Sequence, residues 1–309
     1  MLALEVSQLT KRYRTGRQWL EALRGISLTL AHGEVLAFLG PNGAGKTTAI
    51  KAIAGLIVPD AGQIRIDGRD PHRQPAALSQ LGAVLEGNRN LYWRLTAQEN
   101  LVYFGALKGL PAATVRRRSA ELLTRFGLTA KRDTLVQALS RGMQQKLAIA
   151  VAILHQPQLL LLDEPTLGLD VEATQAVKGL VREIAAAGCA ILLTTHQLDI
   201  AEELADRVAI IQNGAIAAEA TPQELIAQFA GSAYLIELAA PLDSHRQEKL
   251  PLLGARLKGD RQVWVSDTAQ LYSALAILEP LPLARVRKER SSLTDVFLTL
   301  VQSSSAPDT

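Results

Sequence analysis

Two patterns of hydrophobic positions organise this chain of 309 residues. Near the N-terminus, segments such as LALEV and ISLTL alternate apolar with polar side chains, and IRIDG ends in a turn. Such alternation predicts antiparallel strands. Further along, uninterrupted apolar runs stand beside helical patterns, which predicts strands buried on both faces of a parallel sheet. These runs are VLAFL (35–39), LLLL (159–162), CAILL (189–193) and VAII (208–211).

The stretch from about residue 87 to residue 156 has helical spacing throughout, with Thr96 and Ser140 as candidate N-caps. It separates the first buried run from the others. We therefore expect an α/β core over residues 1–230, with a helical subdomain inserted into its parallel sheet.

After Gly231 the pattern begins again. A strand (YLIEL), a second strand (VWV), a helix over 268–278 and a final helix near Ser292 predict a small α+β domain over residues 231–302. The polar tail SSSAPDT, residues 303–309, is expected to be disordered.

Charge does little to identify a partner. The chain has 33 Lys and Arg residues against 30 Asp and Glu, and the signs are mixed along most of it. A nucleic-acid partner is therefore not expected. The nearest approach to a basic run is Arg116, Arg117 and Arg118 on a predicted helix, which favours a solvated helix face over contact with lipid headgroups or a partner.

The single cysteine excludes an internal disulfide and suits a reducing cytosol. Cys189 lies in an apolar run, which predicts a buried and inert thiol. The longest apolar run, Leu147–Leu154, is far shorter than the roughly 20 residues that span a bilayer. The N-terminus has no signal-peptide pattern. Any membrane role is therefore expected to be peripheral.

The sequence GPNGAGKT matches the phosphate loop and lies between a buried strand and a helix. Glycines let backbone amides approach phosphate oxygens, and the helix adds its positive N-terminus. Lys46 is expected to bridge the β and γ phosphates of ATP, and the hydroxyl of Thr47 to bind Mg²⁺. A glycine-rich turn with a chance lysine is the alternative, which the strand and helix context disfavours. The nucleotide-binding residues predicted here are Gly40, Pro41, Asn42, Gly43, Ala44, Gly45, Lys46, Thr47 and Thr48.

Two adjacent carboxylates end the buried strand in LLLLDEP. Open α/β sheets bind ligands at the carboxyl ends of their strands. Asp163 is the expected Mg²⁺ partner, and Glu164 is the candidate base that orients and deprotonates the attacking water. An Asp-Glu pair alone would more often simply end a strand.

Three further motifs accompany this pair: LSRGMQQ (139–145), LGLD (167–170) and TTH (194–196). With the phosphate loop, in this order, they resemble the ATP-binding subunits of ABC transporters, over residues 1–220. The resemblance implies a P-loop NTPase core, ATP hydrolysis and two composite sites. In that family Ser140 and Gly142 of one subunit would close over the γ-phosphate held by the other. One phosphate loop and one such signature per chain then imply a head-to-tail homodimer.

The resemblance also assigns three single residues. His196 would contact the γ-phosphate and stabilise charge in the transition state, whereas a lone histidine on an apolar strand would otherwise be a core residue. Asp170 would couple the two sites, and capping the next helix is a compatible second role. Tyr13 would stack on adenine, with packing alone as the alternative.

Two positions depart from the family pattern. Glu86 stands where the family has a glutamine that senses Mg²⁺ and the membrane partner, so Glu86 is a possible metal ligand. We favour a position outside the direct ligands of Mg²⁺, with Arg89 or Arg94 partly neutralising the Glu86 carboxylate and with Thr47 and Asp163 holding the metal. Arg141 replaces a signature glycine. It would either add a cation near the γ-phosphate or face solvent.

The same resemblance suggests what the subunit drives. Tyr92 and Trp93 lie where the family receives coupling helices of a separately encoded membrane permease, at the cytoplasmic face of the membrane; a structural role inside the helical subdomain is the alternative. The ending SSLTDVFLTL (291–300) resembles the accessory domain of drug, antibiotic and polymer exporters. Export is therefore favoured over import, although the transported substrate is not legible in this chain. Related soluble ATPases act on nucleic acid or ribosomes, but their tandem cores, long coiled coils or zinc cysteines are not visible here.

Overall fold

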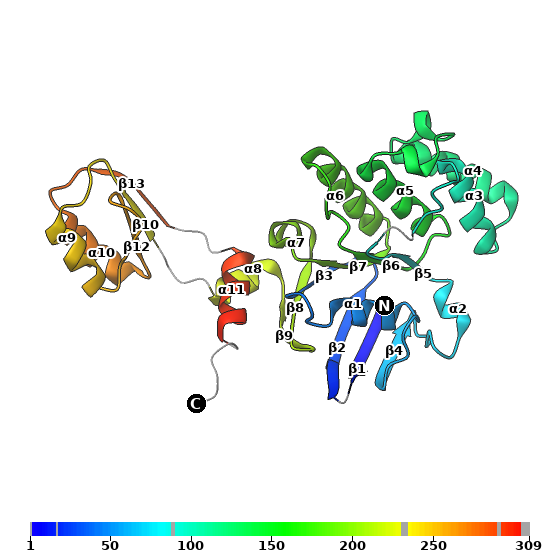
Figure 1. The fold of residues 1–309 in the computed structure, drawn as a ribbon, viewed down its shortest axis with the longest axis horizontal. Helices are drawn as coiled ribbons and strands as arrows, with labels where there is room; N and C mark the ends of the chain where they lie inside the picture. The colour runs from blue at the N-terminus through cyan, green and yellow to red at the C-terminus, as the bar shows by residue number, and fades with distance from the viewer. Residues whose placement is uncertain (1, 17, 88–89, 230–233, 289–291, 304–309) are drawn as a thin grey trace. The chain divides into compact units, whose positions relative to one another are not determined.

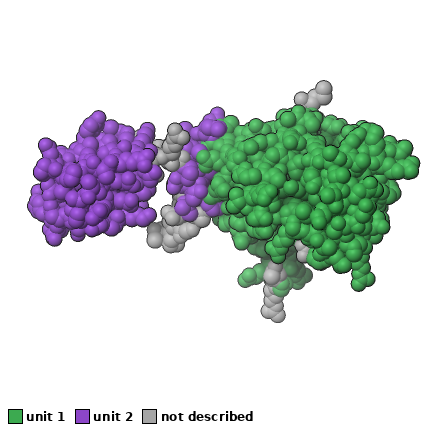
Figure 2. Space-filling view, turned by 90° about the horizontal axis from the view of Figure 1, so that it is seen from above, with its two compact units in different colours: residues 1–222 green, residues 223–309 purple. Residues whose placement is uncertain are grey.

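A computed structural model describes residues 2–16, 18–87, 90–229, 234–288 and 292–303. The chain forms two compact units, residues 1–222 and residues 223–309 (Figure 1, Figure 2). Arg89, Gly231 and nearly all of the expected tail lie outside the described residues. No described helix has both the length and the apolar character needed to cross a membrane.

A three-stranded antiparallel sheet opens the first unit, as the alternation predicts. Its central strand β1 pairs with β2 on one side and with β4 on the other. The inward positions, such as Leu4, Ile26 and Ile64, are buried and the positions between them are largely exposed. The strands are β1 (Leu2–Thr15), β2 (Gln18–Ala31) and β4 (Ala61–Ile66).

A six-stranded sheet in the order β5-β6-β7-β3-β8-β9 forms the centre of this unit. All neighbouring pairs are parallel except β8 and β9, which confirms the parallel sheet predicted from the apolar runs. The alanine-rich β9 carries no clear alternation and was not predicted. The strands are β3 (Val35–Leu39), β5 (Leu81–Val84), β6 (Leu159–Asp163), β7 (Ala190–Thr195), β8 (Arg207–Gln212) and β9 (Ala215–Ala220).

Helices cover both faces of the six-stranded sheet (Figure 1). Helix α1 lies between it and the antiparallel sheet, and one hydrophobic core joins all three, through residues such as Ile50, Phe38 and Ile26. Helices α5 (Arg141–Ile153), α6 and α7 lie on the opposite face. The bounds are α1 (Lys46–Ile53), α6 (Val171–Ala186) and α7 (Leu198–Leu204).

The inserted helices lie between β5 and β6. Thr96 caps α3 in a capping box with Glu99, and Ser140 caps α5, as predicted. The prediction of helix throughout is wrong before α3 begins at Ala97 and again for residues 126–140, where two short 3-10 helices form after Gly127 adopts φ 66. The bounds are α2 (Pro75–Leu78), upstream of β5, then α3 (Ala97–Leu107), α4 (Ala112–Arg125), η1 (Thr129–Lys131), η2 (Val136–Ala138) and α5 (Arg141–Ile153).

The second unit contains an antiparallel sheet in the order β11-β12-β10-β13, with α9 and α10 packed on it. Its element order, β-α-β-β-α-β, is the split βαβ arrangement. The two predicted strands and the helix over 268–278 are present, whereas α9, β11 and β13 were not predicted. The bounds are α8 (Pro222–Phe229), β10 (Tyr234–Leu238), α9 (Ser244–Leu252), β11 (Arg256–Leu257), β12 (Gln262–Val265), α10 (Thr268–Leu278), β13 (Leu283–Lys288) and α11 (Leu293–Ser303).

Candidate nucleotide site

Three neighbouring parallel strands bring the predicted motifs to one edge of the sheet. Strand β7 pairs with β6 on one side, where Asp163 faces Thr194, and with β3 on the other, where Leu39 faces Thr195. The phosphate loop, the two carboxylates and the TTH motif follow these strands. Their carboxyl ends therefore meet although the motifs are far apart in sequence.

Glycine is required at two positions of the phosphate loop by its packing. A Cβ on Gly40 would lie 2.4 Å from the carbonyl oxygen of Ile211, and one on Gly45 would lie 2.4 Å from that of Ala22. Gly45 also has φ 110, a region that side chains rarely adopt. The loop is thus closely packed at Gly40 and Gly45, with Asn42 and Gly43 exposed at its tip, and it leads into the N-terminus of α1, which suits an anion.

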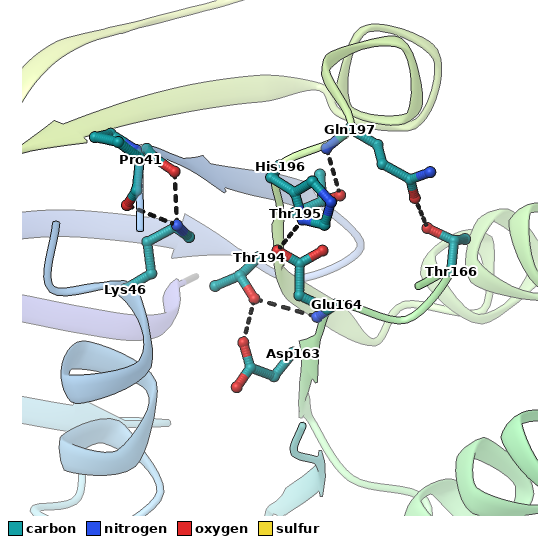
Figure 3. Close-up of polar contacts among 10 residues, drawn as sticks. Pro41, Lys46, Asp163, Glu164, Thr166, Thr194, Thr195, His196 and Gln197 are labelled. Carbon is teal, nitrogen blue, oxygen red and sulfur yellow. Dashed lines mark hydrogen bonds and ion pairs between the residues drawn. The ribbon is translucent and has the colours of Figure 1, made fainter. Parts of the chain in front are cut away.

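Lys46 is the first residue of α1 and is buried. Its ammonium donates to the carbonyl oxygens of Gly40 at 2.6 Å and Pro41 at 3.1 Å (Figure 3). Burial lowers the pKa of Lys46, and the charges of Glu164, Asp163 and, least, Glu86 oppose that shift. The charges of three carboxylates therefore act on the lysine, and that of Glu164 acts most strongly.

The carboxylate of Asp163 is fixed from one side only. Its Oδ1 accepts a hydrogen bond from the Thr194 hydroxyl at 2.5 Å, while its buried Oδ2 has no partner among the described residues. The free Oδ2 of this carboxylate is a ligand of the kind that a hard cation such as Mg²⁺ prefers. Thr47, the second residue of α1, is half-buried. The residues present therefore fit the predicted metal.

Glu164 has a left-handed backbone conformation, with φ 51, directly after β6. Its amide donates to the carbonyl oxygen of Thr194 at 3.1 Å, which holds this turn. Its Oε1 accepts from Nδ1 of His196 at 2.9 Å, because an ionised carboxylate can only accept (Figure 3). The glutamate side chain is 10% exposed and the histidine 51%, so the pair runs from the interior towards solvent.

Glu86 lines a cavity of about 580 Å³ together with Asp163, Glu164 and Arg141. It is exposed, and no described residue forms an ion pair with it, Arg94 included.

Asn90, which the sequence analysis did not select, fixes the turn that carries Glu86. Its Nδ2 donates to the carbonyl oxygens of Leu85 at 2.7 Å and Gly87 at 3.2 Å, and its Oδ1 accepts from the Leu85 amide at 3.1 Å. An asparagine close to a glycine is a turn signal, so the sequence could have indicated this role.

Comparison with known proteins shows which family combines these features. The family model described as ABC transporter matches residues 23–167. The daunorubicin/doxorubicin resistance ATP-binding protein DrrA of Streptomyces peucetius is 38% identical over 307 residues, covering 96% of this chain and 92% of that protein. The chain belongs to the ABC transporter family.

Two further ABC proteins extend the match. The Nod factor export ATP-binding protein I of Ralstonia nicotianae is 36% identical and covers 96% of this chain and 93% of its own length. A solved structure described as an ATP binding subunit of an ABC transporter superposes with a TM-score of 0.66 at 36% identity, covering 74% of this chain and 93% of that one. The predicted P-loop fold and the prediction of an ABC transporter ATPase are confirmed.

The residues of the ABC signature have local partners within this protomer. The Ser140 hydroxyl accepts from the Met143 amide at 3.3 Å, and a Cβ on Gly142 would lie 2.7 Å from that of Ala173 on α6. Asp170 caps α6, as predicted, by accepting from the Ala173 amide at 2.7 Å. Neither Ser140 nor Gly142 has a hydrogen bond to the loop among the described residues.

Arg141 and Tyr13 are the remaining predicted positions. Arg141 is exposed at the start of α5, and its Nη1 would lie 3.1 Å from a Cβ on Gly168. Tyr13 is half-buried on β1, where the ammonium of Lys11 lies 5.8 Å from its ring centroid. The ring of Tyr13 thus has a cation as neighbour.

Proposed function

We propose that this ABC protein hydrolyses ATP with Glu164 as the general base and thereby powers an exporter. The observation that carries the proposal is the Glu164–His196 pair beside the phosphate loop. His196 occupies one oxygen of the glutamate and leaves Oε2 without a partner among the described residues. That oxygen can orient the attacking water and accept its proton.

Lys46 and the loop amides would bind the phosphates. The ammonium now donates to two loop carbonyls, and it would exchange these for oxygens of the β and γ phosphates. Thr47 and Asp163 would hold Mg²⁺. When bound, the ion would neutralise part of the negative charge of the phosphates. The Nε2 of His196, whose side chain is exposed, would stabilise charge on the γ-phosphate.

A head-to-tail homodimer would complete each site. Within one protomer Ser140 caps α5 and Gly142 packs on α6, and among the described residues neither has a hydrogen bond to its own phosphate loop. A second copy can bring its Ser140 amides and hydroxyl onto the γ-phosphate as an anion site. A related cassette, at 27% identity and TM-score 0.64 over 71% of this chain and 98% of that one, is described as a dimeric post-hydrolysis state bound to ADP and Pi.

The transported cargo would pass through a separate membrane permease, with this subunit bound peripherally at the cytoplasmic face. The names of the two relatives above, drug resistance and Nod factor export, support export over import. The permease would dock on an apolar groove of about 350 Å³ next to α3, which Leu56, Phe104 and Leu107 help to line. Tyr92 and Trp93 are 49% and 42% exposed in the neighbouring segment.

Glu164→Gln tests the proposed function. The variant should bind ATP, lose turnover by at least ~100-fold and trap a dimer, because the amide still accepts a hydrogen bond but cannot take the proton. Lys46→Ala should instead weaken ATP binding. Turnover, nucleotide affinity and light scattering measure these effects, with Glu248→Gln on the exposed face of α9 as the control. Normal turnover in Glu164→Gln would refute the assignment, and a monomer at saturating Mg-ATP would refute the composite site.

A further inference from the structure

The three consecutive arginines on α4 do not share one environment. Arg116 and Arg117 are exposed, and Arg117 pairs with Glu121 at 3.0 Å. Arg118 turns inward and is half-buried. Its Nη1 donates to the carbonyl oxygen of Leu154 at 3.1 Å, and its Nη2 to Oε1 of Gln156 at 2.6 Å. The interpretation of a solvated face therefore holds for two of the three arginines and fails for the third.

Arg118 lines a cavity of about 850 Å³ at the edge of the sheet opposite to the phosphate loop. Residues just before β3, β6 and β7 form its floor, namely His32, Gln158 and Cys189. The carboxyl ends of the same strands carry the nucleotide site. The cavity is thus separate from that site, and its volume is that of pockets that hold drug-sized ligands.

Arg118 is the one charged residue of this cavity without a counter-charge among the described residues. Leaving aside the Cys189 thiol, each of the other ionisable side chains that line the cavity has a group of opposite charge within 4 Å. The pairs are Glu121 with Arg117 at 3.0 Å, Arg125 with Glu183 at 3.1 Å, and His32 with Asp67 at 3.8 Å. Burial raises the pKa of Cys189 to about 12, so its thiol stays neutral.

The guanidinium also has donors to spare. It carries five N–H groups, of which two are used, which leaves three, including an Nε enclosed away from solvent. A partly buried cation without a counter-ion is unfavourable, and a bound anion would remove that penalty. Its two existing hydrogen bonds hold the guanidinium in place, so it is preorganised for such a ligand.

The rest of the lining is apolar, with Leu122 on α4, Ile153 on α5, and Ile184 and Ala187 at the end of α6. We propose that the cavity binds a small organic anion, a carboxylate or sulfonate with an apolar body, whose charged group pairs with Arg118. Inorganic anions would lack the contact with the apolar wall.

Such a ligand would join the inserted helices to the core. The cavity walls come from α4 and α5 on one side and from α6 and the strand ends on the other. Helix α5 has 13 residues and is about 20 Å long. Its C-terminal residue, Ile153, lines the cavity, and its N-cap is the signature residue Ser140. A ligand in this cavity would therefore contact the same helix that carries the signature at its other end.

The first test uses anilinonaphthalene sulfonate, a fluorescent anion with an apolar body, and octanoate as competitor. We expect one saturable site that octanoate displaces, with affinity at least ~10-fold weaker in Arg118→Gln because a charge-assisted hydrogen bond is lost. Arg116→Gln, on the exposed face of the same helix, is the matched control and should bind like the wild type. Equal affinity in Arg118→Gln, or displacement by inorganic phosphate as effective as by octanoate, would overturn the proposal.

The second test needs no variant. Cys189 is the only cysteine of the chain and lines the cavity, so its alkylation by iodoacetamide, followed by mass, reports occupancy. The reaction is slow because burial raises the pKa of the thiol to about 12, and the rates with and without ligand at one alkaline pH are therefore compared. Octanoate should slow alkylation of the native protein at least ~5-fold, whereas phosphate at equal ionic strength should not. An unchanged rate with octanoate would contradict the proposal. Neither test depends on ATP hydrolysis, so its outcome is independent of the proposed function.

Discussion

At the scale of single residues, the nucleotide site stores strain where the chemistry is expected. Glu164 has φ 51, and a non-glycine residue in this region costs of the order of 1–3 kcal/mol. The hydrogen bonds to Thr194 and His196 hold it there. In this conformation the largely buried carboxylate reaches Nδ1 of His196 (Figure 3).

Glu86→Gln tests the position that departs most from the family pattern. Glu86 is exposed and has the smallest of the three carboxylate effects on the pKa of Lys46, which fits a place outside the metal's own ligands. We expect basal turnover to stay within about tenfold, roughly 1.4 kcal/mol in the barrier, while stimulation by the membrane partner changes more. A Mg²⁺ titration of purified Glu86→Gln measures this. A hundredfold loss rescued by high Mg²⁺ would show instead that Glu86 binds the metal.

His155 should make stability depend on pH. Burial, then the charge of Lys108, lower its pKa to about 4, against 6.5 in the unfolded chain, despite a hydrogen bond from Nε2 to the carbonyl oxygen of Leu81. Between these values the unfolded chain binds a proton that the folded chain does not. The free energy of unfolding should therefore fall as pH drops from 6.5 to 4.

His155→Gln keeps a donor for Leu81 but cannot titrate, so urea unfolding across this range should show a shallower fall than in the wild type. His245→Gln, at an exposed position on α9, should leave the slope unchanged. The same slope in His155→Gln and wild type would mean that other groups carry the pH dependence.

At the scale of elements, strand ends and helix starts make the site. Three parallel strands deliver side chains at their carboxyl ends, and α1 begins at the phosphate loop. Helices α5 and α6 begin at Ser140 and Asp170, whose side chains accept from the first turn. Helix α1 instead begins after Gly45 with no side-chain cap, which leaves its first amides available to an anion.

Leu107→Glu tests the groove next to α3 as the permease surface. Leu107 ends α3 and is 69% exposed, so the change should leave the free energy of unfolding within ~0.5 kcal/mol. It should reduce copurification with the membrane partner, because a charge would enter an apolar interface. Leu252→Glu, at the end of α9 and 84% exposed, is the matched control. Undiminished copurification of Leu107→Glu would place the permease elsewhere.

At the scale of the whole molecule, the two units have separate hydrophobic cores. One core joins both sheets of the first unit with α1, and the other lies between α9, α10 and the second sheet. Segments with their own cores can fold independently. The nucleotide residues all come from the first unit.

A chain of residues 1–230 should therefore bind ATP with unchanged affinity. Its assembly, with the twin subunit or with the permease, should be weaker if the accessory domain serves that purpose. Nucleotide titration and thermal unfolding of the shortened protein, beside the full chain, measure both effects. Loss of affinity together with global unfolding would show that the second unit is part of the catalytic fold.

The sequence by itself determined the features that depend on neighbouring residues. Alternation and unbroken apolar runs predicted both sheets, and the phosphate loop, the Asp163–Glu164 pair and the caps at Thr96 and Ser140 were legible because motif and context lie within one short segment. These signals are local, since strand and helix periods and capping hydrogen bonds span only a few residues.

Only the tertiary structure decided which residues from distant parts of the chain come into contact. In the sequence Arg118 is one of three consecutive arginines that look equivalent. Only the packing of α4 beside Leu154 and Gln156 directs its side chain inward, to the wall of a cavity. His155, which lies between these two residues in the sequence, acquires its low pKa from burial and from the charge of Lys108 in the same way. Burial and charge pairing depend on distances between segments remote in sequence, which no local pattern records.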